Sequence, residues 1–161
     1  MKEPQAVPLH APAGYPFPKG TEGLLPWSHA ESQIEAAQNY WIATVRPDGR
    51  PHVTPVWGVW VGGALYFDGN PTTRWGRNLA ANPALSIHLE SAEDVVILEG
   101  VVEDLSTDAE LTTRIVAAWD AKYGRLHPEP AGRGIFRVFP RTARGWSKSS
   151  LEDGTRWEFE D

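Results

Sequence analysis

Short apolar segments separated by tight turns occupy most of the chain from residue 40 onward, and this spacing restricts the fold more than any other feature. Pro47-Asp48-Gly49 has the residues of a reverse turn, and Gly62-Gly63 has those of a two-residue hairpin. The segments between these turns are rich in β-branched and aromatic residues, which favour strands. Because strands joined by tight turns run antiparallel, the sequence predicts hairpins rather than a doubly wound parallel sheet.

The pattern predicts a series of short strands with short helices inserted between them. We expect strands over residues 40–46, 52–61, 64–68, 84–89, 94–105, 134–139, 144–148 and 155–159. We expect helices over residues 29–39, 73–81 and from about 111 to Gly124. Ser28 and Thr107 each begin a capping-box pattern, and Asn82-Pro83 ends the second helix. The expected fold is therefore mainly β, an antiparallel barrel with helical elaborations.

Residues 1–26 differ from the rest of the chain because prolines and glycines recur throughout them. We do not expect such a stretch to form regular hydrogen-bond ladders. Two interpretations stay open: a mobile tail, or an extended arm held by Tyr15, Phe17, Leu24 and Leu25. The sequence thus predicts a tail or arm over 1–26 and one domain over 27–161.

The composition excludes several kinds of function. The chain has no cysteine, so it has no disulfide, thiolate metal site or cysteine nucleophile. The five histidines lack the spacing of metal ligands. A net charge of −6 argues against a broad nucleic-acid-binding face. We expect no membrane partner and a cytoplasmic location, since the chain lacks a long apolar segment and its start is unlike a secretory signal.

The segment Asn70-Pro-Thr-Thr-Arg-Trp-Gly-Arg-Asn-Leu79 combines several groups that bind phosphate. Thr72 or Thr73 can cap the helix that follows, and the first amide N–H groups of a helix are free to meet an anion. Arg74 and Arg77 place two guanidinium groups in the same turn. A solvated surface turn would have the same composition, so the residues alone leave both interpretations open.

A second segment, Gly49 to Trp60, has the character of a strand beside a flat ligand. Pro55 lacks an amide N–H, so it requires a sheet edge, a bulge or a missing ladder bond. A ligand can pair with backbone groups that are freed at such a place. Trp57 and Trp60 would supply aromatic walls, although aromatic residues in strands also serve as ordinary core.

Four motifs in order resemble the pyridoxamine 5'-phosphate oxidase-like split β-barrel family. Residues 40–60 are similar to its first hairpin, and Thr73-Arg-Trp-Gly-Arg-Asn-Leu-Ala-Ala-Asn-Pro83 resembles its S-R-K-A-R-N-L-x-x-N-P helix. Residues 94–102 are similar to the next long strand of the family. Thr155-Arg-Trp-Glu-Phe159 resembles the T-R-W-x-F pattern of the flavin/deazaflavin oxidoreductase branch. The resemblance implies a six-stranded antiparallel split β-barrel of Greek-key type, a homodimer, and a cofactor groove between the subunits.

The resemblance also implies the residues of that groove. Thr73, Arg74 and Arg77 would lie at the cofactor phosphate, and the strand from Thr54 to Trp57 would run beside the ring system. Trp75 replaces the family's lysine, and would stack on the ring or close the pocket. The full implied set is Arg50, His52, Thr54, Pro55, Val56, Trp57, Thr73, Arg74, Trp75, Arg77, Asn78, Arg156 and Trp157. Asn78 would stabilise the helix. Arg156 and Trp157 would reach the groove from the C-terminal strand, either of the same subunit or of the partner subunit.

The activity that the resemblance implies is hydride transfer between a flavin-type cofactor and a conjugated small-molecule substrate. Coenzyme F-420 is favoured and FMN is the close alternative. The long acidic tail of F-420 would meet a basic groove formed by Arg46, Arg50, Arg74, Arg77 and Arg144. No catalytic residue is assigned, although His52, Tyr66 and His88 are suitable proton donors by type. The alternatives are an FMN-dependent pyridoxamine 5'-phosphate oxidase-like enzyme, a flavin- or tetrapyrrole-binding protein without turnover, and a structural module.

Overall fold

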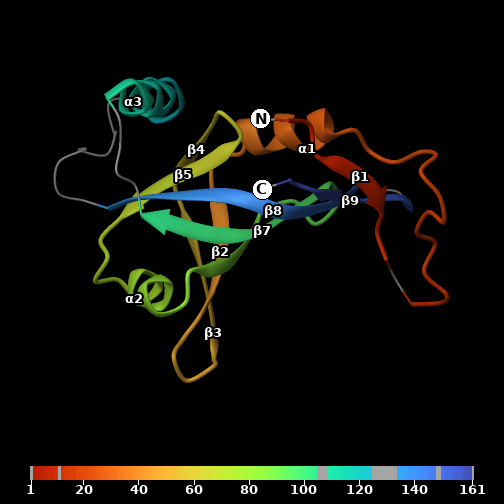
Figure 1. Ribbon diagram of the computed structural model, residues 1–161, viewed down its shortest axis with the longest axis horizontal. Coiled ribbons are helices and arrows are strands. Elements are labelled where there is room, and N and C mark those ends of the chain that lie inside the picture. The colour runs from red at the N-terminus through yellow and green to blue at the C-terminus, as the bar shows by residue number, and fades with distance from the viewer. Residues whose placement is uncertain (1, 11, 105–108, 125–133, 148–149, 161) are drawn as a thin grey trace.

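The computed structural model describes residues 2–10, 12–104, 109–124, 134–147 and 150–160. In these ranges the chain forms three helices, α1 (Trp27–Ala36), α2 (Arg74–Ala81) and α3 (Ala109–Tyr123) (Figure 1). It also forms nine strands: β1 (Gln5–Pro8), β2 (Tyr40–Val45), β3 (Pro51–Val56), β4 (Gly58–Val61), β5 (Ala64–Gly69), β6 (Ala84–His88), β7 (Val95–Asp104), β8 (Gly134–Ser147) and β9 (Ser150–Glu158). The predicted class, mainly antiparallel β with short helices, is confirmed.

One curved antiparallel sheet contains all of these strands. The pairing order is β1-β9-β8-β7-β6-β2-β3, and β5 pairs with both β8 and β4. Only Trp57 separates β3 from β4, so one bent segment pairs with β2 before Trp57 and with β5 after it. The order β3-β2-β6-β7-β8-β5-β4 therefore begins and ends on the same segment. If β3 and β4 are counted as one strand, the seven labelled strands of this order correspond to the six strands of the expected barrel.

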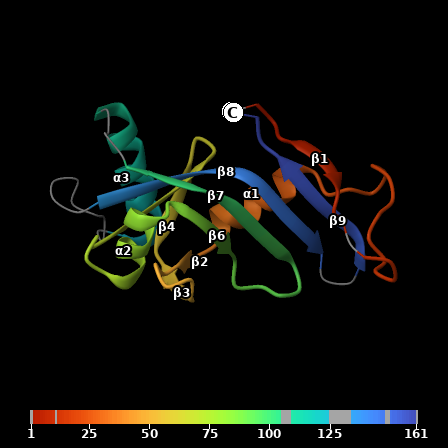
Figure 2. The same cartoon turned by 60° about the horizontal axis from the view of Figure 1, so that its bottom comes forward.

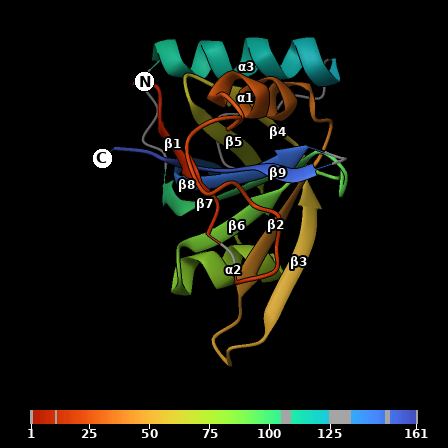
Figure 3. The ribbon, with the colours of Figure 1, turned by 90° about the vertical axis from the view of Figure 1, so that its right-hand side faces the viewer.

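Two apolar clusters hold the helices against this sheet. The larger one joins Ile34 of α1, Tyr40 of β2, Phe67 of β5 and Leu98 of β7, which are almost fully buried. In the smaller one, Ile115 and Trp119 of α3 pack on β4 and β5. Figure 3 shows α3 and α1 near one end of the molecule, and α2 with the β2–β3 hairpin near the other. The two ends are thus packed by different helices.

The helix starts differ from the capping-box prediction. α1 begins at Trp27 after Pro26, and no side chain caps it. Ser28 therefore lies inside the helix, and the Glu31 carboxylate instead accepts a 3.0 Å hydrogen bond from Trp60 Nε1. Thr107 lies outside the described residues. Gly124 has a φ of +69° and follows α3 directly, as predicted from its freedom to adopt that conformation.

The strand boundaries also differ from those predicted from the sequence. Residues 52–61 do not form one strand, because the ladder is interrupted at Trp57. The two strands predicted over 134–139 and 144–148 are one continuous strand, β8. Pro140 is tolerated within it because the register with β7 shifts beside its partner, Gly100, so a regular ladder bond is not required there. β9 begins at Ser150, ahead of the predicted start at Thr155.

The proline-rich N-terminal segment contains an edge strand. β1 pairs with β9, and Leu9 N donates to Gly154 O at 2.9 Å, contrary to the expectation that no ladder forms (Figure 2). An edge strand tolerates nearby prolines because only one of its sides must supply donors. Farther along, Leu25 N donates to Thr155 Oγ1 at 2.8 Å, and Trp157 Nε1 donates to Leu25 O at 3.2 Å. The segment is thus laid along β9 as an arm.

Candidate cofactor-binding site

Two of the predicted segments meet at one pocket of about 360 Å³. Pro55, Val56 and Trp57, at the end of β3, form one part of its wall, and Thr73 and Trp75, at the start of α2, form another. The remaining lining residues are Asn39, Asp68, Gly69 and Asn70. Figure 1 shows α2 and β3 at the same end of the molecule. The fold therefore brings the predicted ring-binding strand next to the predicted phosphate-binding turn.

The strand break at Trp57 shapes one wall of this pocket. A Cβ at Gly58 would lie 2.8 Å from Tyr66 O, so only glycine allows β4 to pass this closely along β5. Gly58 N donates to Tyr123 Oη at 3.1 Å. Trp57 lies between the two ladders, is 48% exposed and stacks on the ring of Tyr123, with 5.3 Å between centroids and 13° between planes. The break thus lets a large aromatic side chain project beside the pocket.

The start of α2 has the cap that the sequence predicted. Thr73 Oγ1 accepts a 3.1 Å hydrogen bond from Gly76 N, while Thr72 is held by Asn70 Oδ1. Helix geometry leaves the amide N–H groups of Arg74 and Trp75 without an intrahelical acceptor. Arg74 and Arg77 are exposed, and the Arg77 guanidinium donates to Thr72 O. Two cations and two amide donors therefore lie at one helix start.

Trp75 and Asn78 point from α2 into the protein. The Trp75 indole packs on Phe67 and Phe136, at centroid distances of 5.6 and 5.1 Å, and is 8% exposed. It forms one side of the pocket. Asn78 Nδ2 donates to Thr44 Oγ1 at 2.9 Å and so ties α2 to β2, in agreement with a helix-stabilising role.

His52 and Thr54 lie on β3 next to this site but do not line the pocket. Both are half-buried and share the strand face that carries buried Val56. Within the described residues, three buried polar atoms on or beside this face have no hydrogen-bond partner: Arg46 Nε, His52 Nδ1 and Asn78 Oδ1. Unpaired buried polar atoms are costly, so this part of the hairpin has unused binding capacity.

Arg50 lies in the β2–β3 turn, where it bonds Asp48 through Nε at 3.0 Å and Nη2 at 2.7 Å. These bonds hold the pKa of the Asp48 carboxyl below its usual value, and the nearby cations Arg46 and Arg74 add to the effect. Arg46, Arg50 and Arg74 therefore gather around one turn. Arg144 does not join them, because it makes a two-point ion pair with Glu99 at 2.9 and 3.1 Å.

The C-terminal residues implied for the site lie elsewhere in this chain. Trp157 is fully buried in the main core, where it packs edge-on against Trp27 at 5.6 Å. Arg156 points from β9 and pairs with Glu158 at 3.2 Å. Neither residue lines the pocket between β3 and α2.

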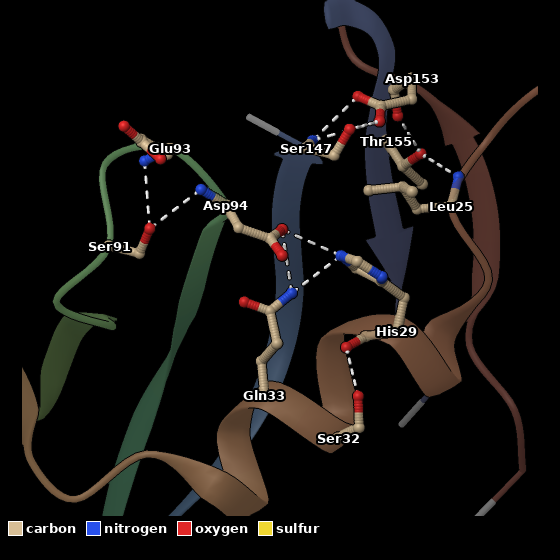
Figure 4. Close-up of polar contacts among 10 residues, drawn as sticks. All are labelled: Leu25, His29, Ser32, Gln33, Ser91, Glu93, Asp94, Ser147, Asp153 and Thr155. Carbon is tan, nitrogen blue, oxygen red and sulfur yellow. Dashed lines mark hydrogen bonds and ion pairs between the residues drawn. The ribbon is translucent and has the colours of Figure 1, made fainter. Parts of the chain in front are cut away.

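A second polar cluster lies at the start of β7 and contains a histidine beside a carboxylate. His29 Nε2 and Gln33 Nε2 of α1 each lie 3.0 Å from Asp94 Oδ1 (Figure 4). Ser147, however, donates to Asp153 rather than to the imidazole. Among the described residues no hydroxyl bonds the His29 ring, so the cluster lacks a nucleophile and anchors α1 to β7. The same residues contain no group of three metal-ligating side chains.

Comparison with known protein families gives a match that covers most of the fold and the whole pocket. The sequence matches the family described as pyridoxamine 5'-phosphate oxidase over residues 27–148, which contain β2 to β8, α2 and the whole pocket lining. The chain belongs to this family. The resemblance proposed from the motifs is confirmed.

Relatives within this family have different names. A pyridoxine/pyridoxamine 5'-phosphate oxidase from Acidovorax sp. (strain JS42) is 32% identical over 164 residues, covering 81% of this chain and 75% of the relative. A solved structure named F420 reductase is 28% identical, with a TM-score of 0.55, over 83% of this chain and 98% of that one. A heme-binding protein from Mycobacterium smegmatis is 25% identical, with a TM-score of 0.59, over 78% and 56% respectively.

Sequence reasoning missed Lys122 and Tyr123, which contact the pocket walls from α3. Tyr123 Oη lies 2.7 Å from Gln38 O and 2.9 Å from Gly58 O, and Lys122 Nζ donates to Gly58 O at 2.9 Å. No motif marks these contacts, because they join residues far apart in the chain. Asp68 and Gly69 could have been found from the sequence, since they directly precede the predicted phosphate segment, which begins at Asn70. None of the described helices has the length and apolarity to cross a membrane.

Proposed function

We propose that this protein is an oxidoreductase that holds a flavin-type cofactor in the pocket between β3 and α2. Coenzyme F-420 is the favoured cofactor and FMN the close alternative. Hydride would pass between the cofactor and a conjugated small molecule. The observation that carries the proposal is the meeting of Pro55–Trp57 with the start of α2 in one pocket. Family membership and the relatives named for oxidase and F420 reductase activity support it.

The start of α2 has the groups needed to hold a phosphate. The free amide N–H groups of Arg74 and Trp75 present the positive end of the helix dipole. The guanidinium groups of Arg74 and Arg77 supply charge-assisted hydrogen bonds. Trp75 removes the lysine that the family motif carries at this position, so the two arginines are the side-chain cations of this turn. The residues present therefore fit a phosphate group.

The hairpin turn beside α2 favours the longer, more acidic cofactor. Arg46, Arg50 and Arg74 gather there, and the buried Nε of Arg46 has no hydrogen-bond partner within the described residues. FMN ends at its phosphate and has no need of cations beyond it. The acidic tail of F-420 would extend past the phosphate toward this turn. This arrangement supports F-420 over FMN.

The chain's own groups would bind and shield the ring. β3 is the last strand in its pairing order, so its outer backbone groups are available to the polar edge of a ring. Trp57 and Trp75 would exclude water from the ring faces. The cofactor itself supplies the hydride chemistry, which requires no protein nucleophile. This agrees with the lack of a nucleophile at the His29–Asp94 cluster.

A tetrapyrrole-binding protein without turnover is the second candidate. The heme-binding relative from Mycobacterium smegmatis favours it, and so does the replacement of a phosphate-binding lysine by Trp75. This candidate predicts a strong visible absorption band when hemin is added, together with weak flavin binding.

Equilibrium binding of F-420, FMN and hemin to the purified protein tests the proposal. Tight F-420 binding with weaker FMN binding is the expected result, and it would justify a screen of quinones, nitro compounds and enones as acceptors. Tight FMN binding alone would shift the assignment to an FMN enzyme. A Kd above about 100 μM for both F-420 and FMN would overturn the proposal, since it corresponds to a binding free energy weaker than roughly −5.5 kcal/mol.

A further inference from the structure

The last turn of α3 joins the two backbone segments that carry Asn39 and Trp57 to the pocket. Tyr123 Oη contacts Gln38 O at 2.7 Å on one side, and accepts from Gly58 N at 3.1 Å on the other. Gln38 immediately precedes Asn39, and Gly58 immediately follows Trp57. Both Asn39 and Trp57 line the pocket. One phenol thus spans the two segments.

Lys122 strengthens the same connection. Its Nζ donates to Gly58 O at 2.9 Å and to Tyr40 Oη at 2.8 Å, and it lies 4.6 Å from the centroid of the Tyr40 ring. Tyr40 Oη in turn donates to Ile34 O at 2.6 Å. Because the half-buried Lys122 ammonium group is also bonded to Tyr40, it holds the Gly58 carbonyl in place at the break between β3 and β4. The backbone after Trp57 is therefore fixed from α3.

The Trp57 indole is covered by the Tyr123 ring on one face, and the residue remains half exposed. Its covered face lies nearly parallel to the Tyr123 ring, at 13°, and the residue is 48% exposed. A parallel pair of this kind sets the plane of the outer ring as well as its position. Because Trp57 also lines the pocket, its exposed surface can meet a flat ring there.

We propose that Lys122 and Tyr123 are positioning residues, which hold the Trp57 indole as a rigid flat wall so that the pocket selects a planar conjugated ring. This inference rests on the proposed function, because the ring it expects is the tricyclic ring of the cofactor. It adds that α3, which carries none of the phosphate or strand motifs, determines ring specificity.

The test uses lumiflavin, which has the planar flavin ring and no phosphate chain, so the arginines of α2 do not contribute to its binding. The variants are Tyr123→Leu, Tyr123→Phe and Lys122→Met. The matched controls are Tyr15→Leu and Lys19→Met, since both residues are exposed on the N-terminal arm. The indole N–H signal of Trp57 is followed by NMR in the ligand-free full-length protein, and is identified by its loss in Trp57→Phe.

Tyr123→Leu is expected to move the Trp57 signal and to weaken lumiflavin binding roughly fivefold to tenfold, the range of an aromatic stacking contact. Tyr123→Phe keeps the ring but loses the hydroxyl contacts with Gln38 and Gly58, so its affinity for lumiflavin is expected to lie between those of wild type and Tyr123→Leu. Lys122→Met is expected to shift the Trp57 signal less than Tyr123→Leu does. The controls are expected to match wild type in both measurements.

The proposal is overturned if Tyr123→Leu leaves the Trp57 signal in place. It is also overturned if that variant moves the signal but binds lumiflavin with wild-type affinity, because the indole would then not face the ring. Failure of the proposed function looks different: the wild-type protein itself would bind neither lumiflavin, FMN nor F-420. In that case movement of the Trp57 signal in Tyr123→Leu would still support the positioning role.

Discussion

At position 75 a tryptophan stands where the family motif has lysine, and its indole packs on Phe67 and Phe136. The substitution moves this position from ligand binding to the core. The space that it fills is tight, because a Cβ at Gly69 would lie 2.3 Å from the indole. A phosphate at α2 would thus depend on Arg74 and Arg77.

Removal of both guanidinium groups is therefore expected to affect cofactor binding strongly. Each charge-assisted hydrogen bond contributes about 1.5–3 kcal/mol, so Arg74→Ala and Arg77→Ala should each raise the cofactor Kd roughly tenfold to a hundredfold. Fluorescence titration of F-420 and FMN measures the effect. Arg141→Ala is the control, since this exposed arginine lies on β8 away from the pocket. Unchanged affinity in both α2 variants would contradict the phosphate assignment.

Lys122 gives the fold a specific dependence on pH. Burial lowers the pKa of its ammonium group from 10.5 to about 8. Between these values the unfolded chain binds a proton that the folded chain has released, so this group adds stability as pH rises from about 8 toward 10. Burial raises the pKa values of Tyr40 and Tyr123, and the nearby Glu35 carboxylate of α1 raises that of Tyr40 further. At higher pH, where tyrosines of the unfolded chain ionise, these two residues therefore lower the stability and oppose the contribution of Lys122.

Urea unfolding at pH 7.5 and 9.5 checks this prediction. The stability difference between wild type and Lys122→Met should become more favourable to wild type at the higher pH. A difference that does not vary with pH would show that Lys122 titrates normally. Using the difference removes the contribution of the overall negative charge, which the two proteins share almost fully.

At the scale of single elements, the cap of α2 should be measurable by itself. Thr73→Ala removes the acceptor for Gly76 N and should lower the free energy of unfolding by about 1 kcal/mol. Thr73→Ser keeps the hydroxyl and should retain most of that stability. Thermal or urea unfolding measures both variants. A loss of equal size in Thr73→Ser would mean that the methyl group, and not the cap, is responsible.

Sequence reasoning succeeded where the cause of an element is local. The turns at Gly49 and Gly62-Gly63, the Thr73 cap and the end of α3 at Gly124 each depend on a few adjacent residues. It failed where a distant partner decides. A strand was predicted to end at residue 139, but the register shift in β7 lets β8 continue through Pro140. Ser28 matched a capping box ahead of a helix that was predicted to begin at residue 29, yet the helix starts two residues earlier, at Trp27.

The residues of the candidate site show the same difference between features with a local cause and features decided by a distant partner. The two segments that meet at the pocket were identified from their own residues, and they line it through Pro55–Trp57 and through Thr73 and Trp75. The contact of Tyr123 with Gly58 was not, because its partners are 65 residues apart. Trp157 was expected near the groove by its place in a motif, but its burial against Trp27 depends on the packing of α1.

At the scale of the whole molecule, we propose that the chain forms a homodimer through the outer face of β2 and β3. Directly paired residues of an antiparallel sheet point to the same side. The pairs on this face are apolar: Trp41 with Pro55, Ala43 with Val53, and Val45 with Pro51. Val45 and Val53 are 42% and 51% exposed, and solvent-exposed apolar residues grouped in this way favour association.

Light scattering should therefore give twice the chain mass of 17.8 kDa. Val53→Glu places a charge within the proposed contact and should shift the protein toward the monomer. Tyr15→Glu is the control, because Tyr15 is also exposed but lies on the arm. A monomeric wild-type protein would contradict a groove shared between subunits.

The arm also affects when the fold can be completed during synthesis. β1 leaves the ribosome before its pairing partner β9, which is the last strand described. The hairpin of β2 and β3 can form early, since its contacts are local, whereas β1 can pair only after β9 has been made. Until β1 and β9 pair, the outer edge of β9 and the indole of Trp157 have no cover from the arm. The pairing of β1 with β9 is thus one of the last steps in the formation of the described sheet.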